Sequence, residues 1–300
     1  MMNRAGLGIA CALGAASLYG LVPNFARAAF VNGVPGIEST LFRTFVISIV
    51  FAVIAVVQNE RLTIPKGAMP SFAGQALATF LVSASYLASV QFIPVGLSVI
   101  IFFLFPVLIM LLAPVVEGRS PGLFRLAVAL VAFCGLAIAI GPSFEDLDIR
   151  GIVLAAIASA GATLQFFSGR SISRYMPPAA FGSLVHLVIL APILLIVLAT
   201  GSGSLQMLPG GSATGLGLVF MCGVAAVYVI AYMVHMLSLR FAPASTVAPF
   251  FNLEPVVTTA IAAAILDERL QLNQYAGGGL VLAALGASAF LGRREKQSHG

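Results

Sequence analysis

A small set of polar side chains lies inside long apolar stretches of this chain, and these side chains are the ones that could do chemistry. A charged side chain at the centre of a lipid bilayer costs about 2.5–3.5 kcal/mol on insertion scales, so an intramembrane polar group is expected to face a partner, water or a solute. The same residues are therefore candidates for a binding cavity. The side chains that we expect to bind a substrate are Tyr19, Asn24, Arg43, Ser83, Tyr86, Gln165, His186, Tyr228, Tyr232 and Asn252.

The spacing of Tyr228, Tyr232 and His235 places them on one face of a helix, because they follow an i, i+4, i+7 pattern. A shift of 149 residues brings this stripe onto Thr79, Ser83 and Tyr86. One interpretation is a cavity wall, whose hydroxyls form hydrogen bonds and whose rings stack on an aromatic solute or hold an ammonium group. The other is a set of residues at the membrane interface, which suits Tyr86 and His235 near the ends of their segments.

Arg43 and His186 form a second matched pair, 143 residues apart and each inside the second apolar segment of its half of the chain. The guanidinium of Arg43 could bind a substrate carboxylate through two parallel hydrogen bonds. Alternatively, Arg43 extends to the outer membrane interface or pairs with Glu38, and His186 is a hydrogen-bonded core histidine. Both interpretations stay open for each residue.

Glu254 is the acidic residue deepest within an apolar segment, and Pro255 follows it directly. In one role, a neutral Glu254 donates its proton to a carbonyl that Pro249 or Pro255 leaves free, and so stabilises a bent helix. In the other role, Glu254 is a proton site whose occupancy differs between inward-facing and outward-facing states. That second role would couple export to a proton gradient.

The composition excludes a soluble fold. Hydrophobic residues make up 60% of the 300 residues and charged residues 8%, with a mean hydropathy of +1.07, which leaves too little polar surface to cover a water-soluble domain. The apolar runs are about 20 residues long, as membrane-spanning helices require, and do not alternate as barrel strands do. Cys11, Cys134 and Cys222 lie within such runs and are interpreted as small core residues. No motif implies a cofactor, a metal or a nucleic-acid partner.

Breaks at proline, glycine and polar residues divide the chain into ten expected membrane helices. Their approximate ranges are 6–30, 37–57, 71–91, 95–116, 122–141, 151–169, 179–199, 213–238, 244–266 and 274–292. Pro94 and Pro243 are 149 residues apart, as are Pro106 and Pro255, which indicates an internal duplication into domains of residues 1–146 and 147–300. Because each domain holds five helices, the second must be inserted upside down. The predicted fold class is an all-α integral membrane protein with ten transmembrane helices in two inverted five-helix repeats.

The basic residues are distributed unevenly across the expected membrane. If the N-terminus is cytoplasmic, 11 of the 15 Lys and Arg residues lie on the cytoplasmic side, while the opposite side carries the acidic stretch from Glu145 to Asp148. The positive-inside rule therefore predicts a multi-pass protein of the cell inner membrane with both termini in the cytoplasm. The first apolar segment continues to Phe30, which is too long for the apolar core of a signal peptide, so we expect an uncleaved span.

The chain resembles the drug/metabolite transporter superfamily, in its EamA-type branch of ten helices. The resemblance rests on Leu253-Glu254-Pro255, the Asp267-Glu268-Arg269 cluster and the glycines Gly277 to Gly279, with the same layout in both halves. It implies that helices 1–4 and 6–9 surround a central cavity, that helices 5 and 10 pack outside it, and that amino acids, drugs or related metabolites are exported. Aromatic amino acid exporters are the members that the chain is expected to be most similar to. The first repeat has Phe105 at the position that matches Glu254. The two repeats therefore do not carry a symmetric pair of carboxylates.

These features predict a secondary transporter that exports a small metabolite by alternating access through a central cavity. The expected solute is an amino acid, with an aromatic or apolar side chain preferred. The expected partners are this solute, the lipid bilayer and, through Glu254, protons. Two other classes stay open. An intramembrane enzyme would need a clustered acid/base or metal set, which the sequence does not show, and a passive channel would conduct without saturation or exchange.

Overall fold

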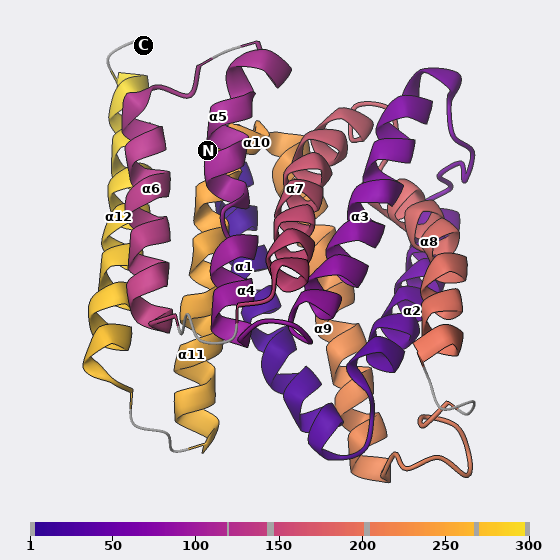
Figure 1. Cartoon of the computed structure of the whole chain (residues 1–300). Helices are drawn as coiled ribbons and strands as arrows, with labels where there is room; N and C mark the ends of the chain where they lie inside the picture. Colours follow the sequence, from indigo (N-terminus) through magenta and orange to yellow (C-terminus); the bar gives the residue numbers. More distant parts are fainter. Residues whose placement is uncertain (1–3, 119, 143–146, 201–204, 267–269, 298–300) are drawn as a thin grey trace.

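The computed structural model of the chain describes residues 4–118, 120–142, 147–200, 205–266 and 270–297. The expected features at Arg119, Glu145, Asp146 and Asp267 to Arg269 therefore lie outside the described residues. The described part is built of helices and connecting turns (Figure 1). The helices are α1 (Arg4–Val31), α2 (Gly36–Val57), η1 (Lys66–Ala68), α3 (Met69–Ser89), α4 (Val95–Phe102), α5 (Phe105–Val116), α6 (Leu123–Ile140), α7 (Ile149–Ile172), α8 (Pro178–Thr200), α9 (Gly215–Phe241), α10 (Ala244–Val247), η2 (Ala248–Asn252), α11 (Leu253–Leu266) and α12 (Leu272–Gln297).

The ten expected spans are confirmed as ten membrane-length segments, because α4 with α5 and α10 with η2 and α11 each form one broken span. Nine of these segments in the described chain are long and apolar enough to cross a membrane, and the tenth, α12, has 26 residues and packs along α6. The segment ends lie within a few residues of the expected ones. The apolar runs and the breaks between them were therefore sufficient to locate each helix.

The two halves are related by inversion. Figure 1 shows α1 and α7, the first helices of the two repeats, running in opposite directions across the molecule. The packing follows the same symmetry: α1 lies along α9 and α7 along α3, so the first helix of each repeat contacts the third helix of the other. The second helices, α2 and α8, pair with each other, and so do the fifth, α6 and α12. The predicted inverted five-helix repeats are confirmed.

The fourth span of each repeat is broken at matching positions. In the first repeat the helix stops at Phe102 and restarts at Phe105, with Pro106 as the second residue of α5. In the second repeat the stretch Ala248–Asn252, which contains Pro249, forms the tighter helix η2 before α11 begins. Proline has no amide hydrogen and clashes with the preceding turn, so it starts a helix more readily than it continues one. The breaks leave irregular backbone near the middle of the bundle.

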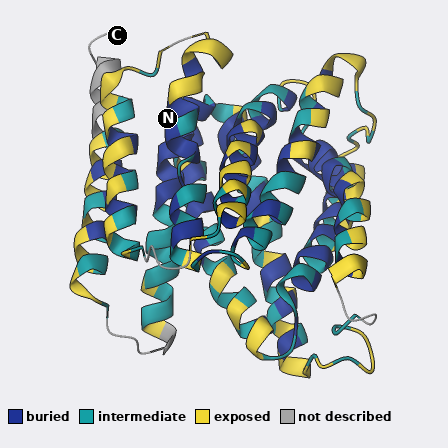
Figure 2. Cartoon of the chain, viewed as in Figure 1, coloured by how far each residue is buried: buried dark blue, intermediate teal, exposed yellow. Residues whose placement is uncertain are grey.

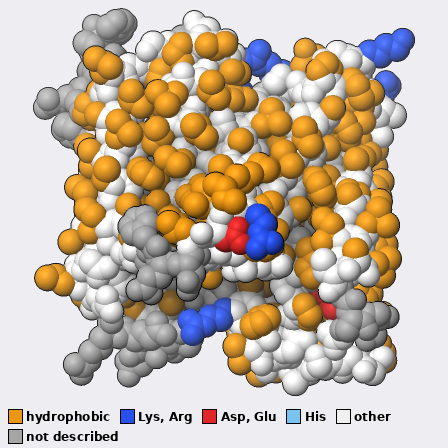
Figure 3. Space-filling model, viewed as in Figure 1, with side chains coloured by type: hydrophobic (Ala, Val, Ile, Leu, Met, Phe, Trp, Pro, Cys, Tyr) orange, Lys and Arg blue, Asp and Glu red, His pale blue; other side chains and the backbone are white. Residues whose placement is uncertain are grey.

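We call the side of the bundle where α1 begins and α12 ends the terminal face, and the side where α1 ends and α2 begins the distal face. Figure 2 shows that buried residues gather in the terminal half of the bundle, while the distal half is more open. Figure 3 shows an exterior covered mainly by hydrophobic side chains, as expected for a surface that faces lipid. At the distal face, hydrogen bonds from Arg150 to Asp148, which caps α7, hold the pKa of the Asp148 carboxyl below its ordinary value.

Candidate functional site: a central cavity

A cavity of about 320 Å³ lies between the two repeats. It reaches the distal face, because Gly36 at the start of α2 and Leu87 near the end of α3 both belong to its wall. The walls come from α1 to α5 in the first repeat and from α7, α9, η2 and α11 in the second, whereas α6 and α12 do not contribute. The sequence-predicted residues that line it are Tyr19, Arg43, Ser83, Tyr86, Gln165, Tyr228 and Glu254.

Arg43 projects into this cavity from the second turn of α2. Its guanidinium lies over the ring of Tyr228, with 4.2 Å between the guanidinium carbon and the ring centroid, and Nη2 donates a hydrogen bond to Ser83 Oγ at 3.4 Å. The alternative pair with Glu38 is not formed. The Glu38 carboxylate instead accepts hydrogen bonds from the backbone amides of Gln206 and Met207, at 2.9 and 3.0 Å, and so fastens the α8–α9 loop to α2. Arg43 therefore keeps donors available to a ligand.

Aromatic rings form most of the remaining wall. Tyr19 packs edge-on against Tyr228 with 5.6 Å between ring centroids, and Tyr86 packs on Phe102 at 4.9 Å. Phe105, which stands in the place that matches Glu254, contacts Phe166 at 5.2 Å. Such walls favour planar or apolar solutes, because stacked and edge-to-face pairs add to the gain from burying apolar area.

His235 lies at the inner end of the cavity and is only 2% exposed. The sequence showed its helical register with Tyr228 but gave it no greater weight than an interfacial residue. Neither ring nitrogen has a hydrogen-bond partner in the described part of the chain. A buried polar atom left in this condition costs about 1–3 kcal/mol, and both nitrogens are covered in this state, so a group inside the cavity would reach them only after a turn of the ring.

Glu254 enters the cavity from the first turn of α11. Within the described residues its carboxylate makes no hydrogen bond and no ion pair, and only its backbone carbonyl is used, by Thr258 Oγ1 at 3.0 Å. The expected hydrogen bond from Glu254 to a carbonyl that Pro249 or Pro255 leaves free is not formed among the described residues. The side-chain contact at this bend comes from Asn252, whose Nδ2 donates to the Pro249 carbonyl at 3.1 Å. The bend of this helix is thus supported by Asn252, and the carboxylate of Glu254 is left facing the cavity.

Four of the predicted site residues lie outside the cavity wall. Asn24 Nδ2 donates to the carbonyls of Gly20 and Thr258, at 3.3 Å each, and so joins α1 to α11. His186 Nδ1 hydrogen bonds with the Gly182 carbonyl at 2.8 Å, which is the core interpretation of this histidine. Tyr232 and Asn252 are fully buried. The structure gives these four residues contacts with the protein rather than with the cavity.

A buried polar layer that sequence reasoning missed lies on the terminal side of Tyr228. Its centre is Gln75 on α3, which donates to the Tyr232 hydroxyl at 3.1 Å and accepts from Ser168 Oγ at 2.7 Å. Gln165 Nε2 donates to Thr79 Oγ1 at 3.0 Å in the same layer. A signal for Gln75 was present, because Gln75, Thr79 and Ser83 repeat every four residues along one helix face. The layer binds α3, α7 and α9 together.

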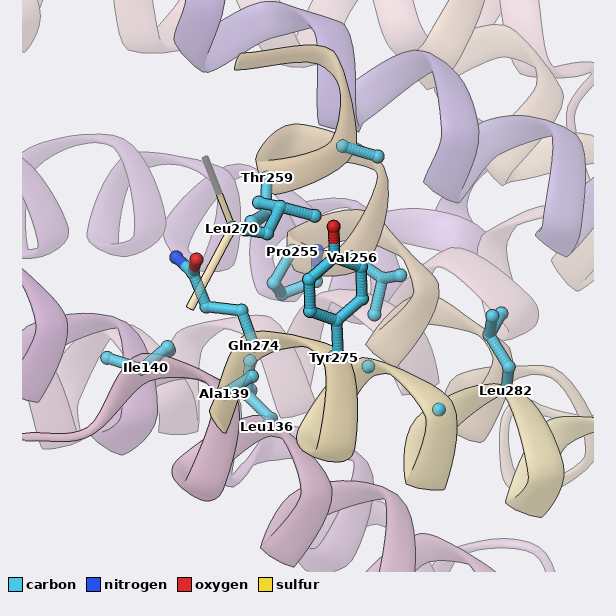
Figure 4. A pocket seen from close by; sticks show the side chains of 13 residues that line it. Leu136, Ala139, Ile140, Pro255, Val256, Thr259, Leu270, Gln274, Tyr275 and Leu282 are labelled. Atoms are coloured by element: carbon cyan, nitrogen blue, oxygen red, sulfur yellow. The ribbon is translucent and has the colours of Figure 1, made fainter. Parts of the chain in front are cut away.

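A second hollow, of about 310 Å³, lies on the outer side of α11 between α6 and α12 (Figure 4). Pro255, Val256 and Leu282 are typical of its apolar lining, and the 13 lining residues include no charged side chain. None of the predicted site residues lines it. A charged or zwitterionic solute would find no partner there, so the central cavity is the candidate site.

Comparisons with known proteins agree with this architecture. The EamA-like transporter family matches the chain twice, over residues 6–141 and 149–289. The chain belongs to the EamA-like transporter family. A crystal structure of another protein superposes with a TM-score of 0.82 over 95% of this chain and 98% of the other, at 15% sequence identity, which confirms the fold. No curated protein matches the sequence.

Family membership has a direct functional consequence. An EamA-like chain with this helical content is a multi-pass membrane protein and a transporter of small solutes. The predicted resemblance to the drug/metabolite transporter fold is confirmed. The boundary between the expected domains at residues 146 and 147 falls between the two family matches and stays a prediction.

Proposed function

We propose that this protein exports an amino acid, with an aromatic or apolar side chain preferred, by alternating access through the central cavity. The observation that carries the proposal is that Arg43 and Glu254, of opposite charge, line one aromatic cavity and are not paired with each other. An amino acid offers a carboxylate for the guanidinium and an ammonium group for the carboxylate. Its side chain would lie against the rings.

The size and chemistry of the cavity support a small zwitterion. A volume of about 320 Å³ is at the lower end of the range of about 300–1,000 Å³ for small-molecule pockets. The Arg43 guanidinium suits a carboxylate, since its planar fork can donate two parallel hydrogen bonds. Tyr19, Arg43 and Glu254 all line this one small cavity, so a solute bound in it lies near both charged side chains.

Alternating access is supported by the unequal packing of the two faces. The cavity reaches the distal face, whereas toward the terminal face the helices close on one another, with Ala12, Leu239 and Ala242 fully buried. The described basic side chains at helix ends and loops of the terminal face are Arg4, Arg61, Lys66, Arg125, Arg170, Arg174 and Arg240. On the positive-inside rule this face is cytoplasmic, so the cavity is open to the opposite side of the membrane, which in our proposal is the outer side of the cell inner membrane.

A counterflow experiment tests the proposal. Purified protein is reconstituted into liposomes loaded with one unlabelled amino acid at a time, and entry of the labelled amino acid is measured for all twenty. We expect saturable exchange that is strongest for aromatic and large apolar amino acids. A passive channel would show flux without exchange stimulation, and absence of exchange for every amino acid would refute the proposal.

Arg43→Gln sharpens this test. Glutamine keeps a hydrogen-bond donor near Ser83 and removes the charge, so binding of an amino acid should weaken at least tenfold, as expected for loss of a charge-assisted hydrogen bond of about 1.5–3 kcal/mol. The amide of the same amino acid, which lacks the carboxylate, serves as the matched ligand. Its competition should be weak against the wild type and should change little in Arg43→Gln. An equal loss for acid and amide would contradict the assignment of Arg43 to the carboxylate.

A further inference from the structure

We infer that His235 is a specificity-determining residue, at the inner end of the cavity, for the polar edge of an aromatic ring. The group it would recognise is a hydroxyl or a ring N–H, as on a phenol or an indole. This inference rests on the proposed amino acid export and narrows its substrate class to aromatic amino acids that carry such a group.

Three aromatic residues pack around the His235 ring and form an aromatic end wall of the cavity. Phe166 lies 4.5 Å from it and Phe251 lies 4.6 Å from it between ring centroids, and Tyr19 stands edge-on at 6.0 Å. All four residues line the same cavity. They come from α1, α7, α9 and η2, so this end wall, the His235 subsite, is built from both repeats. Planar apolar walls of this kind favour an aromatic ring over a branched aliphatic side chain.

The nitrogens of His235 supply the polar contact that the surrounding phenylalanines cannot. The side chain is 2% exposed, yet neither Nδ1 nor Nε2 has a hydrogen-bond partner in the described part of the chain. His186, the other described histidine, differs in this respect, because its Nδ1 is bonded to the Gly182 carbonyl. Both nitrogens are covered in this state, so the His235 ring must turn toward the cavity to take a partner from its contents. Buried polar atoms are nearly always hydrogen bonded in proteins, which favours such a turn when a polar solute is bound.

The distance from His235 to the charged end of the cavity suits an extended aromatic amino acid. The Arg43 guanidinium stacks over the ring of Tyr228, and Tyr228 lies seven residues before His235 on α9. At a rise of 1.5 Å per residue, these two levels are about 10 Å apart along the helix. A carboxylate held by Arg43 would therefore leave the far edge of a tyrosine or tryptophan side chain near His235, whereas a short aliphatic side chain would not reach it.

His235→Phe tests the inference, because it keeps a ring among the three aromatic neighbours and removes both nitrogens. Exchange of tyrosine and of phenylalanine is measured with the full chain in liposomes. We expect tyrosine exchange, as Vmax/KM, to fall at least tenfold more than phenylalanine exchange. His186→Phe is the matched control, since it makes the same change outside the cavity, and it should leave the ratio of the two amino acids unmoved. An unchanged ratio in His235→Phe would overturn the inference.

A binding measurement keeps the inference testable whatever is transported. The chain contains six tyrosines but no tryptophan, so the fluorescence of an indole ligand excited beyond the tyrosine absorption band is observed without tryptophan background. Indole should bind the wild type at least tenfold more tightly than 1-methylindole, which lacks the N–H, and His235→Phe should abolish this difference. His235→Gln, which retains a hydrogen-bonding side chain, should restore part of it.

The two measurements separate the two proposals. A wild type that exchanges no amino acid but distinguishes the two indoles through His235 would refute the proposed function and support the subsite. Exchange of amino acids with equal binding of both indoles, and with an unmoved tyrosine-to-phenylalanine ratio, would leave the function standing and refute the subsite.

Discussion

Gln75 Nε2 donates a hydrogen bond of 3.1 Å to the Tyr232 hydroxyl, and both side chains are fully buried. The bond joins α3 of the first repeat to α9 of the second, one helical turn nearer to the terminal face than Tyr228. The Tyr232 ring also packs against His186, with 4.7 Å between ring centroids. The contact therefore holds the repeats together on the side where the cavity is closed, and alternating access would require it to separate.

Tyr232→Phe should destabilise the protein without weakening substrate binding. The substitution removes the oxygen that accepts from the Gln75 amide, and an unsatisfied buried donor costs about 1–3 kcal/mol. Because Tyr232 does not line the cavity, the KM for exchange should stay near that of the wild type. Thermal unfolding of the purified protein and counterflow kinetics measure the two quantities.

Tyr228→Phe is the control for this prediction. It removes the same hydroxyl from a tyrosine of the cavity wall, where no protein hydrogen bond to that oxygen is recorded within the described chain. Stability should hold, and the KM should change if the solute uses that hydroxyl. A Tyr232→Phe protein as stable as the wild type would contradict the role given to the Gln75–Tyr232 contact.

The closed terminal face also depends on a close approach of α1 and α9 at Gly8. A Cβ added there would lie 2.5 Å from Ala242 Cβ, which is too short for two carbon atoms, so the helices would have to move apart. We expect Gly8→Ala to destabilise this closure by about 1–3 kcal/mol, as for other overpacked sites, and to slow exchange. Accessibility of a cysteine placed in the cavity, measured from the terminal side, should increase.

Gly14→Ala on the same helix separates packing from helix propensity. A Cβ at Gly14 would meet only Val234 Cγ1 at 3.7 Å, an ordinary contact. Alanine is favoured over glycine within a helix by about 0.5–1 kcal/mol, so this variant should be slightly more stable than the wild type. If both alanine variants behaved alike, the tight approach at Gly8 would not be responsible for the closure.

The sequence was sufficient to predict the membrane spans and the inverted repeat, but it predicted the residues of the cavity wall only in part. Apolar length and the breaks between apolar runs located the membrane helices, and the matched prolines Pro106 and Pro255 indicated the repeat, but no pattern predicted that the fourth span of each repeat is broken. Within the polar stripe on α9, Tyr232 does not line the cavity, and the reason is geometric. With 3.6 residues per turn, a step of four advances past the starting face and a step of three falls short of it, so Tyr232 and His235 point about 60° apart. One faces Gln75 and the other the cavity.

Gln75 and Glu254 show a second limit of prediction from the sequence. The repeat offset drew attention to residues whose partner in the other half is also polar, and the position that matches Gln75 holds the apolar Val224. For Glu254, the sequence could not say whether its carboxyl would donate to a carbonyl at the bend. Asn252 instead turns back along η2 to donate to the Pro249 carbonyl, a local contact that no pattern indicated.

Cysteine labelling tests the proposed orientation in the membrane. In a background lacking Cys11, Cys134 and Cys222, Leu208→Cys in the α8–α9 loop should react with a membrane-impermeant maleimide added to intact cells, since this side chain is 53% exposed. Lys66→Cys, at the opposite face, should react only after the cells are opened. The reverse pattern would place the terminal face outside, and labelling of both from the same side would contradict the inverted arrangement.

We propose that Glu254 is the proton site of this transporter, in which case Glu254→Gln should uncouple transport from the proton gradient while leaving the protein folded. The carboxylate makes no hydrogen bond or ion pair in the described residues, so glutamine, which has nearly the same shape, removes no stabilising contact. Loss of the charge should weaken binding of the substrate ammonium group at least tenfold, as for a charge-assisted hydrogen bond of about 1.5–3 kcal/mol. Counterflow at saturating amino acid should persist, and uptake driven by an imposed proton gradient should vanish.

Glu38→Gln is the matched control for that uncoupling. Its carboxylate is also buried, but it accepts hydrogen bonds from the Gln206 and Met207 amides and does not line the cavity. This variant should lose stability, because a charge-assisted contact that fastens the α8–α9 loop is weakened, and should keep gradient-driven uptake. If Glu254→Gln retained full gradient-driven uptake, Glu254 would be no proton site. If Glu38→Gln lost that uptake and Glu254→Gln did not, the coupling carboxylate would lie at the distal loop instead of in the cavity.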